Sequence, residues 1–226
     1  MSHIEQALSE IRAQLTERTR LVAVSKFHPA EMIEEAYRCG QRIFGESHVQ
    51  ELQEKHAILP DDIEWHFIGH LQTNKVKYIA PYVSLIHSVD SPRLLHEIDR
   101  QGARFDRRIP CLLQLHIARE ETKFGFSPEE LIEYLQTDDW RALAHVELRG
   151  LMCMASNVDD EAQIDGEFAL AYSLFQRIKG TFFSDDASFC ECSWGMSGDY
   201  LIALRHGSTL IRVGSMIFGE RDYNAH

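Results

Sequence analysis

Short β-rich runs alternate with amphipathic, helix-like segments from about residue 20 to the end of this 226-residue chain. This order favours a parallel sheet whose strands are joined by crossover helices. Eight strand–helix units favour closure into a barrel over an open, doubly wound sheet. The expected strands are residues 21–26, 43–46, 65–69, 85–89, 110–117, 147–154, 189–194 and 210–218.

Helix start signals follow several of these runs, as at Ser127, where Pro and two Glu come next. An amphipathic stretch from Ile4 to about Glu17 precedes the first strand, so residues 1–19 should form an extra helix outside the barrel. No linker rich in Pro, Gly or Ser divides the sequence. The expected fold is therefore α/β: a (β/α)8 TIM barrel with an extra N-terminal helix, forming one domain over residues 1–226.

The charge balance limits the partners of the protein. Acidic residues outnumber basic ones 35 to 23, and the net charge of -12 argues against a nucleic acid as the main partner. No apolar run reaches the roughly 18 residues needed to span a bilayer, so we expect no membrane segment. The five cysteines are odd in number and no signal peptide precedes them, which predicts a reducing cytoplasm.

Lys26 ends the first expected strand, and side-chain alternation places it on the same face as Val22 and Val24. That face should be the barrel interior. A desolvated lysine has a lowered pKa and supplies the neutral amine that attacks an aldehyde. Lysines at strand ends also commonly extend to solvent, and this position alone does not decide between the two.

Two glycine-containing turns follow the seventh and eighth expected strands. Residues 193–199 join a strand to a helix and include Ser193 and Ser197, and the next strand contains Arg212 before Gly214. Phosphate sites in barrels recur at these two loops, because glycine lets the backbone approach and unpaired N–H groups face the anion. Ordinary helix caps also use Ser and Asp, and Arg212 could instead be paired within the barrel.

Two further patterns resemble metal sites. His66 and His70 lack a third ligand and the Glu of a helical zinc motif, so the sequence predicts no metal there. Cys190 and Cys192 are spaced as same-face strand residues, which favours core packing over ligation.

Six motifs occur in order along the chain: Val24-Ser25-Lys26, Phe44-Gly45-Glu46, Trp65-His66-Phe67-Ile68-Gly69 with Leu71-Gln72-x-Asn74-Lys75, Arg149-Gly150-Leu151-Met152, Gly195-Met196-Ser197-x-Asp199 and Arg212-Val213-Gly214-x-x-Ile217-Phe218-Gly219. Together, from about residue 21 to residue 223, they resemble the pyridoxal phosphate homeostasis protein family. The resemblance implies a barrel like the N-terminal domain of alanine racemase, a mostly monomeric state and no robust catalytic turnover.

The same resemblance implies roles for individual residues. Lys26 would hold pyridoxal 5'-phosphate (PLP) as a Schiff base, and Arg212 would face the pyridine nitrogen. Ser197, Gly214 and neighbouring N–H groups would hold the phosphate. The other residues expected near the cofactor are Met152, Ser193, Asn74, Lys75 and a second lysine, Lys123.

Two positions depart from the family pattern. Ser47 stands where the family usually has Asn, which removes an expected side-chain contact to the cofactor. His28 stands where the family often has a second lysine, which removes a relay amine. Neither change touches the expected phosphate site.

The leading functional hypothesis is a protein that binds and supplies PLP in intracellular vitamin B6 homeostasis, with PLP-dependent apoenzymes as possible recipients. A guanidinium retains its own proton, so Arg212 would make the cofactor a poor electron sink. We also expect no room after the eighth strand for the second domain of a racemase. The alternatives are a PLP-dependent amino-acid racemase and a cofactor-free Schiff-base aldolase.

Overall fold

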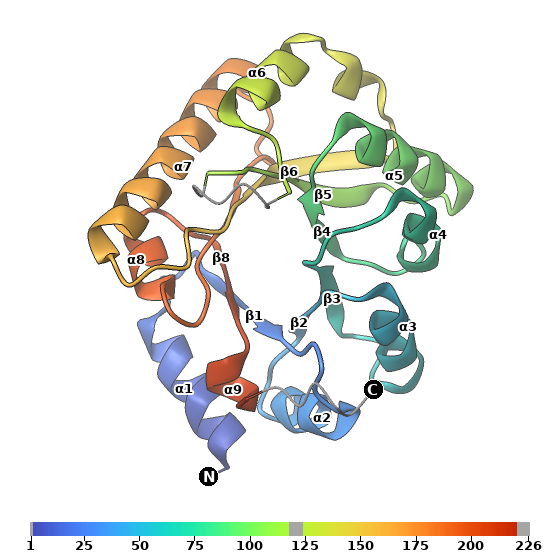
Figure 1. Ribbon diagram of the computed structural model, residues 1–226. Helices are drawn as coiled ribbons and strands as arrows, with labels where there is room; N and C mark the ends of the chain where they lie inside the picture. Colours follow the sequence, from blue (N-terminus) through green and yellow to red (C-terminus); the bar gives the residue numbers. More distant parts are fainter. Residues whose placement is uncertain (1, 118–123, 221–226) are drawn as a thin grey trace.

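The computed structural model describes residues 2–117 and 124–220, and it contains a closed barrel of eight parallel strands in sequence order (Figure 1). The barrel and its alternating helices confirm the expected fold class. The strands are β1 Arg20–Val24, β2 Ile43–Glu46, β3 Glu64–Phe67, β4 Leu85–Val89, β5 Ile109–Gln114, β6 Val146–Met152, β7 Glu191–Ser193 and β8 Leu210–Val213.

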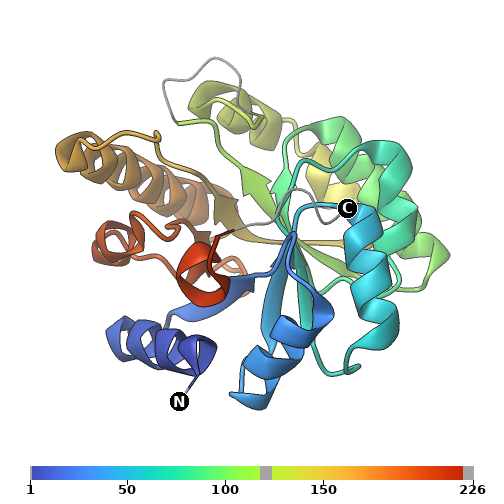
Figure 2. The same cartoon turned by 60° about the horizontal axis from the view of Figure 1, so that its bottom comes forward.

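Helices surround the strands as an outer layer, and Figures 1 and 2 both show the additional helix α1 outside the ring, beside α9. None of the described helices is long and apolar enough to cross a membrane. The helices are α1 His3–Gln14, α2 Ala30–Arg38, α3 Val49–Ile58, α4 Val76–Ile79, α5 Pro92–Arg104, α6 Pro128–Gln136, α7 Glu161–Phe182, α8 Tyr200–Arg205 and α9 Ser215–Phe218, with 3-10 turns η1 Thr73–Lys75 and η2 Asp139–Ala142.

Local chemistry explains where the helices begin. Ser127 forms a capping box with Glu130: each side chain accepts a hydrogen bond from the other residue's backbone N–H. Ser91 caps α5 ahead of a proline, and Asp160 caps α7 through two N–H groups. These starts lie at the expected sequence signals.

Several expected strands extend two or more residues past the observed ends, and two of these differences affect the site. β1 ends at Val24, two residues before Lys26, because Phe27 adopts a left-handed φ of 64° and the His28 N–H donates to the Ser25 carbonyl. The last strand ends at Val213, and the apolar run that was expected to extend it forms α9. Short apolar runs have no periodicity that separates a buried strand from a buried helix.

The side chains inside the barrel change from apolar to polar along its axis, towards the carboxyl ends of the strands. A small apolar cluster fills one layer, and the next residues on the same face of several strands, towards the carboxyl end, are polar: His87, Gln114 and Arg212. Because polar side chains on the axis must find partners there, this layer is where a functional site is expected. The apolar cluster consists of Val22, Ile43, Leu85, Leu112, Met152 and Leu210.

The two neighbouring cysteines do not share the core. Cys192 is buried and Cys190, which precedes β7, is exposed. The expectation that both thiols pack in the core was therefore wrong for Cys190, because the strand begins only at Glu191.

Candidate functional site

Lys26 lies in a tight turn at the carboxyl end of β1 and is partly buried. The preceding Ser25 is completely buried and anchors this turn to β2, since its N–H donates to the Gly45 carbonyl at 3.1 Å and its hydroxyl to Glu46 Oε1 at 2.6 Å. The position of the Lys26 backbone therefore depends on the end of β2.

A buried ion cluster of Lys55, Glu46 and Glu51 also holds this turn. Lys55 of α3 donates from Nζ to Glu46 Oε1 at 2.8 Å, to Glu51 Oε1 at 2.7 Å and to the Ser25 carbonyl at 2.8 Å. Glu51 also accepts a hydrogen bond from the Phe27 N–H. The sequence reasoning missed Lys55 and Glu51; their spacing of four on a helix was a usable signal for an ion pair but not for its burial.

Glu46 is the member of this cluster whose charged form is disfavoured. Burial raises its pKa to about 7, although the Lys55 ammonium works in the opposite direction. Its Oε2 atom has no hydrogen-bond partner within the described residues. One ammonium faces two carboxyl groups, so a proton on Glu46 relieves both the burial and the repulsion from Glu51.

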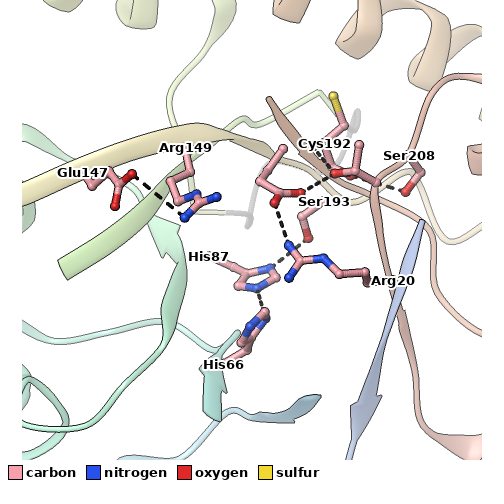
Figure 3. A network of polar contacts seen from close by, with 10 residues as sticks. Arg20, His66, His87, Glu147, Arg149, Cys192, Ser193 and Ser208 are labelled. Atoms are coloured by element: carbon pink, nitrogen blue, oxygen red, sulfur yellow. Dashed lines mark hydrogen bonds and ion pairs between the residues drawn. The ribbon is translucent and has the colours of Figure 1, made fainter. Parts of the chain in front are cut away.

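A chain of buried polar side chains runs through the barrel interior, and Figure 3 shows three of its members, Ser193, His87 and His66. Arg212, 4% exposed, donates from Nη1 to the Ser193 hydroxyl at 2.6 Å and from Nη2 to the Cys153 carbonyl at 3.0 Å. Ser193 Oγ lies 2.8 Å from His87 Nδ1, and His87 Nε2 lies 2.9 Å from His66 Nδ1. We call these four side chains, Arg212, Ser193, His87 and His66, the polar column.

Burial keeps both histidines neutral, lowering the pKa of His66 to about 3 and that of His87 well below its usual range. Arg212 can only donate, so the Ser193 hydroxyl accepts from it and has one proton to give. If that proton goes to His87 Nδ1, His87 donates from Nε2 to His66. This arrangement gives a partner to the Ser193 hydroxyl proton, to both His87 ring nitrogens and to His66 Nδ1.

The two glycine turns expected to hold an anion do meet. The Gly214 N–H donates to Ser197 Oγ at 3.4 Å, which joins the turn after β8 to the turn after β7. Asp199 braces the latter turn by accepting from the Met196 N–H, and Gly195 adopts a left-handed φ of 94° that a side chain would strain. Both turns lie at the same end of the barrel as Lys26.

Gly214 also has a structural role that the sequence did not reveal. A Cβ atom on Gly214 would lie 2.9 Å from the Val24 carbonyl oxygen, so glycine here lets the β8 turn pack against β1 just before Lys26. His28, one of the two departures from the family pattern, reinforces this junction because its ring lies 5.2 Å from the ring of Phe218 in α9.

The remaining expected residues are more scattered. Met152 and Ser193 are both buried, Met152 within the apolar cluster and Ser193 within the polar column. Asn74 and Lys75 lie in η1 after β3, exposed, and Lys75 borders a pocket of about 760 Å³ beside Phe27 and His70. Lys123 lies outside the described residues.

Comparison with known proteins gives a consistent result. The family model for the alanine racemase N-terminal domain matches residues 1–222. The pyridoxal phosphate homeostasis protein of Pasteurella multocida is 36% identical over 208 residues, covering 91% of this chain and 88% of its own length. The corresponding protein of Schizosaccharomyces pombe is 35% identical and covers 98% of this chain and 94% of its own length.

Solved structures agree with the sequence matches. PipY of Synechococcus elongatus without PLP superposes with a TM-score of 0.89 at 37% identity, covering 96% of this chain and all of PipY, and the form with PLP bound has a TM-score of 0.85. Alanine racemase of Bartonella henselae, at 15% identity and a TM-score of 0.74, covers 99% of this chain and 60% of its own. That likeness concerns the fold alone.

The raised pKa of Glu46 predicts a pH effect on stability. A carboxyl group whose pKa is about 7 in the folded state and 4.5 when unfolded binds its proton more tightly in the folded state. This contribution is complete below pH 4.5 and is lost as the pH rises through 7. From pH 5 to 8, wild type should therefore lose on the order of 2 kcal/mol of unfolding free energy relative to Glu46→Gln.

Urea unfolding at several pH values measures this difference. The control is Glu54→Gln, which changes an exposed carboxylate on α3, the helix that carries Lys55 and Glu51. Parallel pH profiles for wild type and Glu46→Gln would contradict the assignment.

The polar column predicts energetic coupling between its histidines. His87→Leu leaves Ser193 Oγ and His66 Nδ1 without their partner and should cost about 2–5 kcal/mol of unfolding free energy. The double variant with His66→Leu should cost clearly less than the sum of the single changes, because the two rings share a bond. Additive losses in a double-mutant cycle of urea unfolding would show that the bond does not form.

Proposed function

Since the chain belongs to the pyridoxal phosphate homeostasis protein family, we propose that it binds PLP at the carboxyl end of its barrel and acts in intracellular vitamin B6 homeostasis. The observation that carries this proposal is the meeting of three elements at one end of the barrel. An amine on Lys26, a guanidinium on Arg212 and the joined turns of Ser197 and Gly214 all lie there.

The chemistry of these groups fits the cofactor. PLP supplies an aldehyde that condenses with a lysine amine, a ring nitrogen that accepts a hydrogen bond, and a phosphate dianion. Lys26 is the proposed attachment point and Arg212 the proposed neighbour of the ring nitrogen. Ser197, with the first N–H groups of the turn that begins at Gly214, would hold the phosphate.

The remaining proposed contacts belong to the walls of the site. Met152 and Ser193, both buried, would support the ring from within the barrel, and Asn74 would approach the cofactor from the loop after β3. Ser193 acts through Arg212: it accepts hydrogen bonds from Nη1 on both its carbonyl, at 2.7 Å, and its hydroxyl, at 2.6 Å. These bonds fix the plane of the guanidinium before any ligand arrives.

Arg212 favours binding and supply of the cofactor over catalysis. A guanidinium does not give up its proton, so the ring nitrogen beside it would stay unprotonated and would withdraw electrons weakly. The bonds to Ser193 and Cys153 hold Arg212 in place. The low sequence identity to alanine racemases does not favour the racemase alternative.

We further propose that residues 1–226 act as a single domain, that the protein is a cytoplasmic monomer and that PLP-dependent apoenzymes receive the cofactor. The continuous barrel and its one N-terminal helix support the first point. The net charge of -12 supports the absence of a nucleic-acid partner.

Lys26→Ala should abolish the visible absorption that wild type acquires on incubation with PLP, because the covalent bond requires its amine. The barrel should remain folded, as judged by circular dichroism. Lys77→Ala, which removes an exposed lysine beyond η1, is the control and should behave as wild type. Borohydride reduction followed by peptide mass spectrometry identifies the modified lysine. Label on Lys123 in place of Lys26 would overturn the assignment.

The phosphate should dominate retention of the cofactor. Charge-assisted hydrogen bonds contribute about 1.5–3 kcal/mol each, so pyridoxal should bind at least about 100-fold more weakly than PLP. Ser197→Ala should weaken PLP binding about tenfold and leave pyridoxal binding nearly unchanged. Ser173→Ala, an exposed serine on α7, is the control. Equilibrium titration measures all six protein–ligand pairs, and equal affinities for the two aldehydes in wild type would place the phosphate elsewhere.

A further inference from the structure

A second pocket, of about 670 Å³, opens at the opposite, amino-terminal end of the barrel. It lies between the starts of β1, β7 and β8 on one side and helix α7 on the other. Arg20 begins β1, whereas Lys26 follows the other end of the same strand. The pocket is therefore separate from the proposed PLP site, and nothing in the proposed function uses it.

The pocket is rich in positive charge within an acidic protein. Arg18, Arg20, Arg149 and Lys179 line it, and Glu191 is the one acidic side chain among the lining residues. The Arg20 guanidinium pairs with Glu191 at 2.6 Å. Within residues 2–117 and 124–220, neither Arg18 nor Lys179 has an acidic partner. A local excess of cations in a chain of net charge -12 concentrates the anion-attracting field at one place.

Arg149 is held in an unusual position. The register of β5 against β6 shifts so that Leu148 pairs with Cys111 and Gly150 with Leu112, which leaves Arg149 as the extra residue of a bulge. Bulges of this kind redirect a side chain, and they occur often at barrel rims. The Arg149 Nε atom is buried without a hydrogen-bond partner in the described part of the chain, and Glu147 approaches Nη1 only to 3.9 Å (Figure 3). A buried donor without an acceptor is costly, and the Arg149 side chain as a whole, 35% exposed, can be reached from the pocket by an anionic ligand.

The walls of the pocket suit an organic ligand rather than a bare ion. Tyr172 and Phe175 of α7 present aromatic rings, and Gln176, Ser208 and Thr209 add polar groups. The volume lies within the range that small-molecule sites occupy. Guanidinium groups bind phosphate oxygens through paired N–H donors, which lysine alone does not provide.

We propose that this amino-terminal pocket binds a phosphorylated small molecule that carries at least two negative charges and a ring-sized body. Arg149 and Arg18 bind the phosphate oxygens with Lys179, while Arg20 stays paired with Glu191. The aromatic side chains of α7 contact the body of the ligand. The site is thus a second anion site, built from side-chain cations, where the proposed PLP phosphate site relies largely on backbone N–H groups.

ADP is a suitable probe because it combines two phosphates with a flat ring. Isothermal titration calorimetry of the full-length protein, at low salt with EDTA, should detect saturable binding of ADP and of pyrophosphate, and none of adenosine. The double variant Arg18→Gln/Lys179→Gln should weaken ADP binding about tenfold or more, since two charges at the phosphates are lost. Both side chains lack acidic partners, so their removal breaks no ion pair.

The matched control is Arg93→Gln/Arg177→Gln, which removes the same charge from exposed positions on α5 and α7 outside the pocket. It should bind ADP as wild type does. Lys26→Ala and Ser197→Ala should also bind ADP normally, because they alter the other end of the barrel. The proposal is overturned if ADP shows no saturable binding at millimolar concentration, if both double variants weaken it equally, or if Ser197→Ala abolishes it.

Discussion

Arg212 is a cation almost entirely enclosed within the barrel, and the arrangement of the site depends on satisfying it. A buried guanidinium without partners would cost several kcal/mol, so the ends of β6 and β7 supply acceptors: the Cys153 and Ser193 carbonyls and the Ser193 hydroxyl. Ser193 in turn needs a partner for its own proton, and His87 provides it. His87 in turn needs a hydrogen-bond partner for its second ring nitrogen, and His66 provides it, which explains why two neutral histidines lie in the barrel interior.

The backbone around Lys26 is constrained from two sides. On one side, Lys55 and Glu46 hold the Ser25 backbone and hydroxyl. On the other, Gly214 allows the turn after β8 to pack against Val24, so the amine and the Ser197 turn keep a fixed spacing. Positioning a reactive group on a rigid strand end, with a second set of contacts behind it, is how binding sites gain precision.

The sequence predicted the elements that depend on local or periodic signals. Strand alternation and helix caps located the barrel, and glycine with serine marked the turns that meet at Ser197 and Gly214. It did not predict contacts between distant residues. Lys55 is a plain helical lysine until tertiary packing buries it, and His66 was weighed only as a metal ligand because its partner His87 lies on the next strand. The packing of α3 against the barrel decides the first case and strand register decides the second, and a single sequence contains neither.

Hydrogen-bonded polar side chains connect the two ends of the barrel, but they do not carry a proton from one end to the other. Arg20, at the amino end, is close enough for its charge to help lower the pKa of both histidines. Because burial keeps His66 and His87 neutral, the polar column carries no net charge between Arg20 and Arg212. Only the direction of its hydrogen bonds can differ, and Arg212, which always donates to Ser193, favours one direction. An anion held near Arg20 would therefore act on the cofactor end through a weak, distance-screened field rather than by proton transfer.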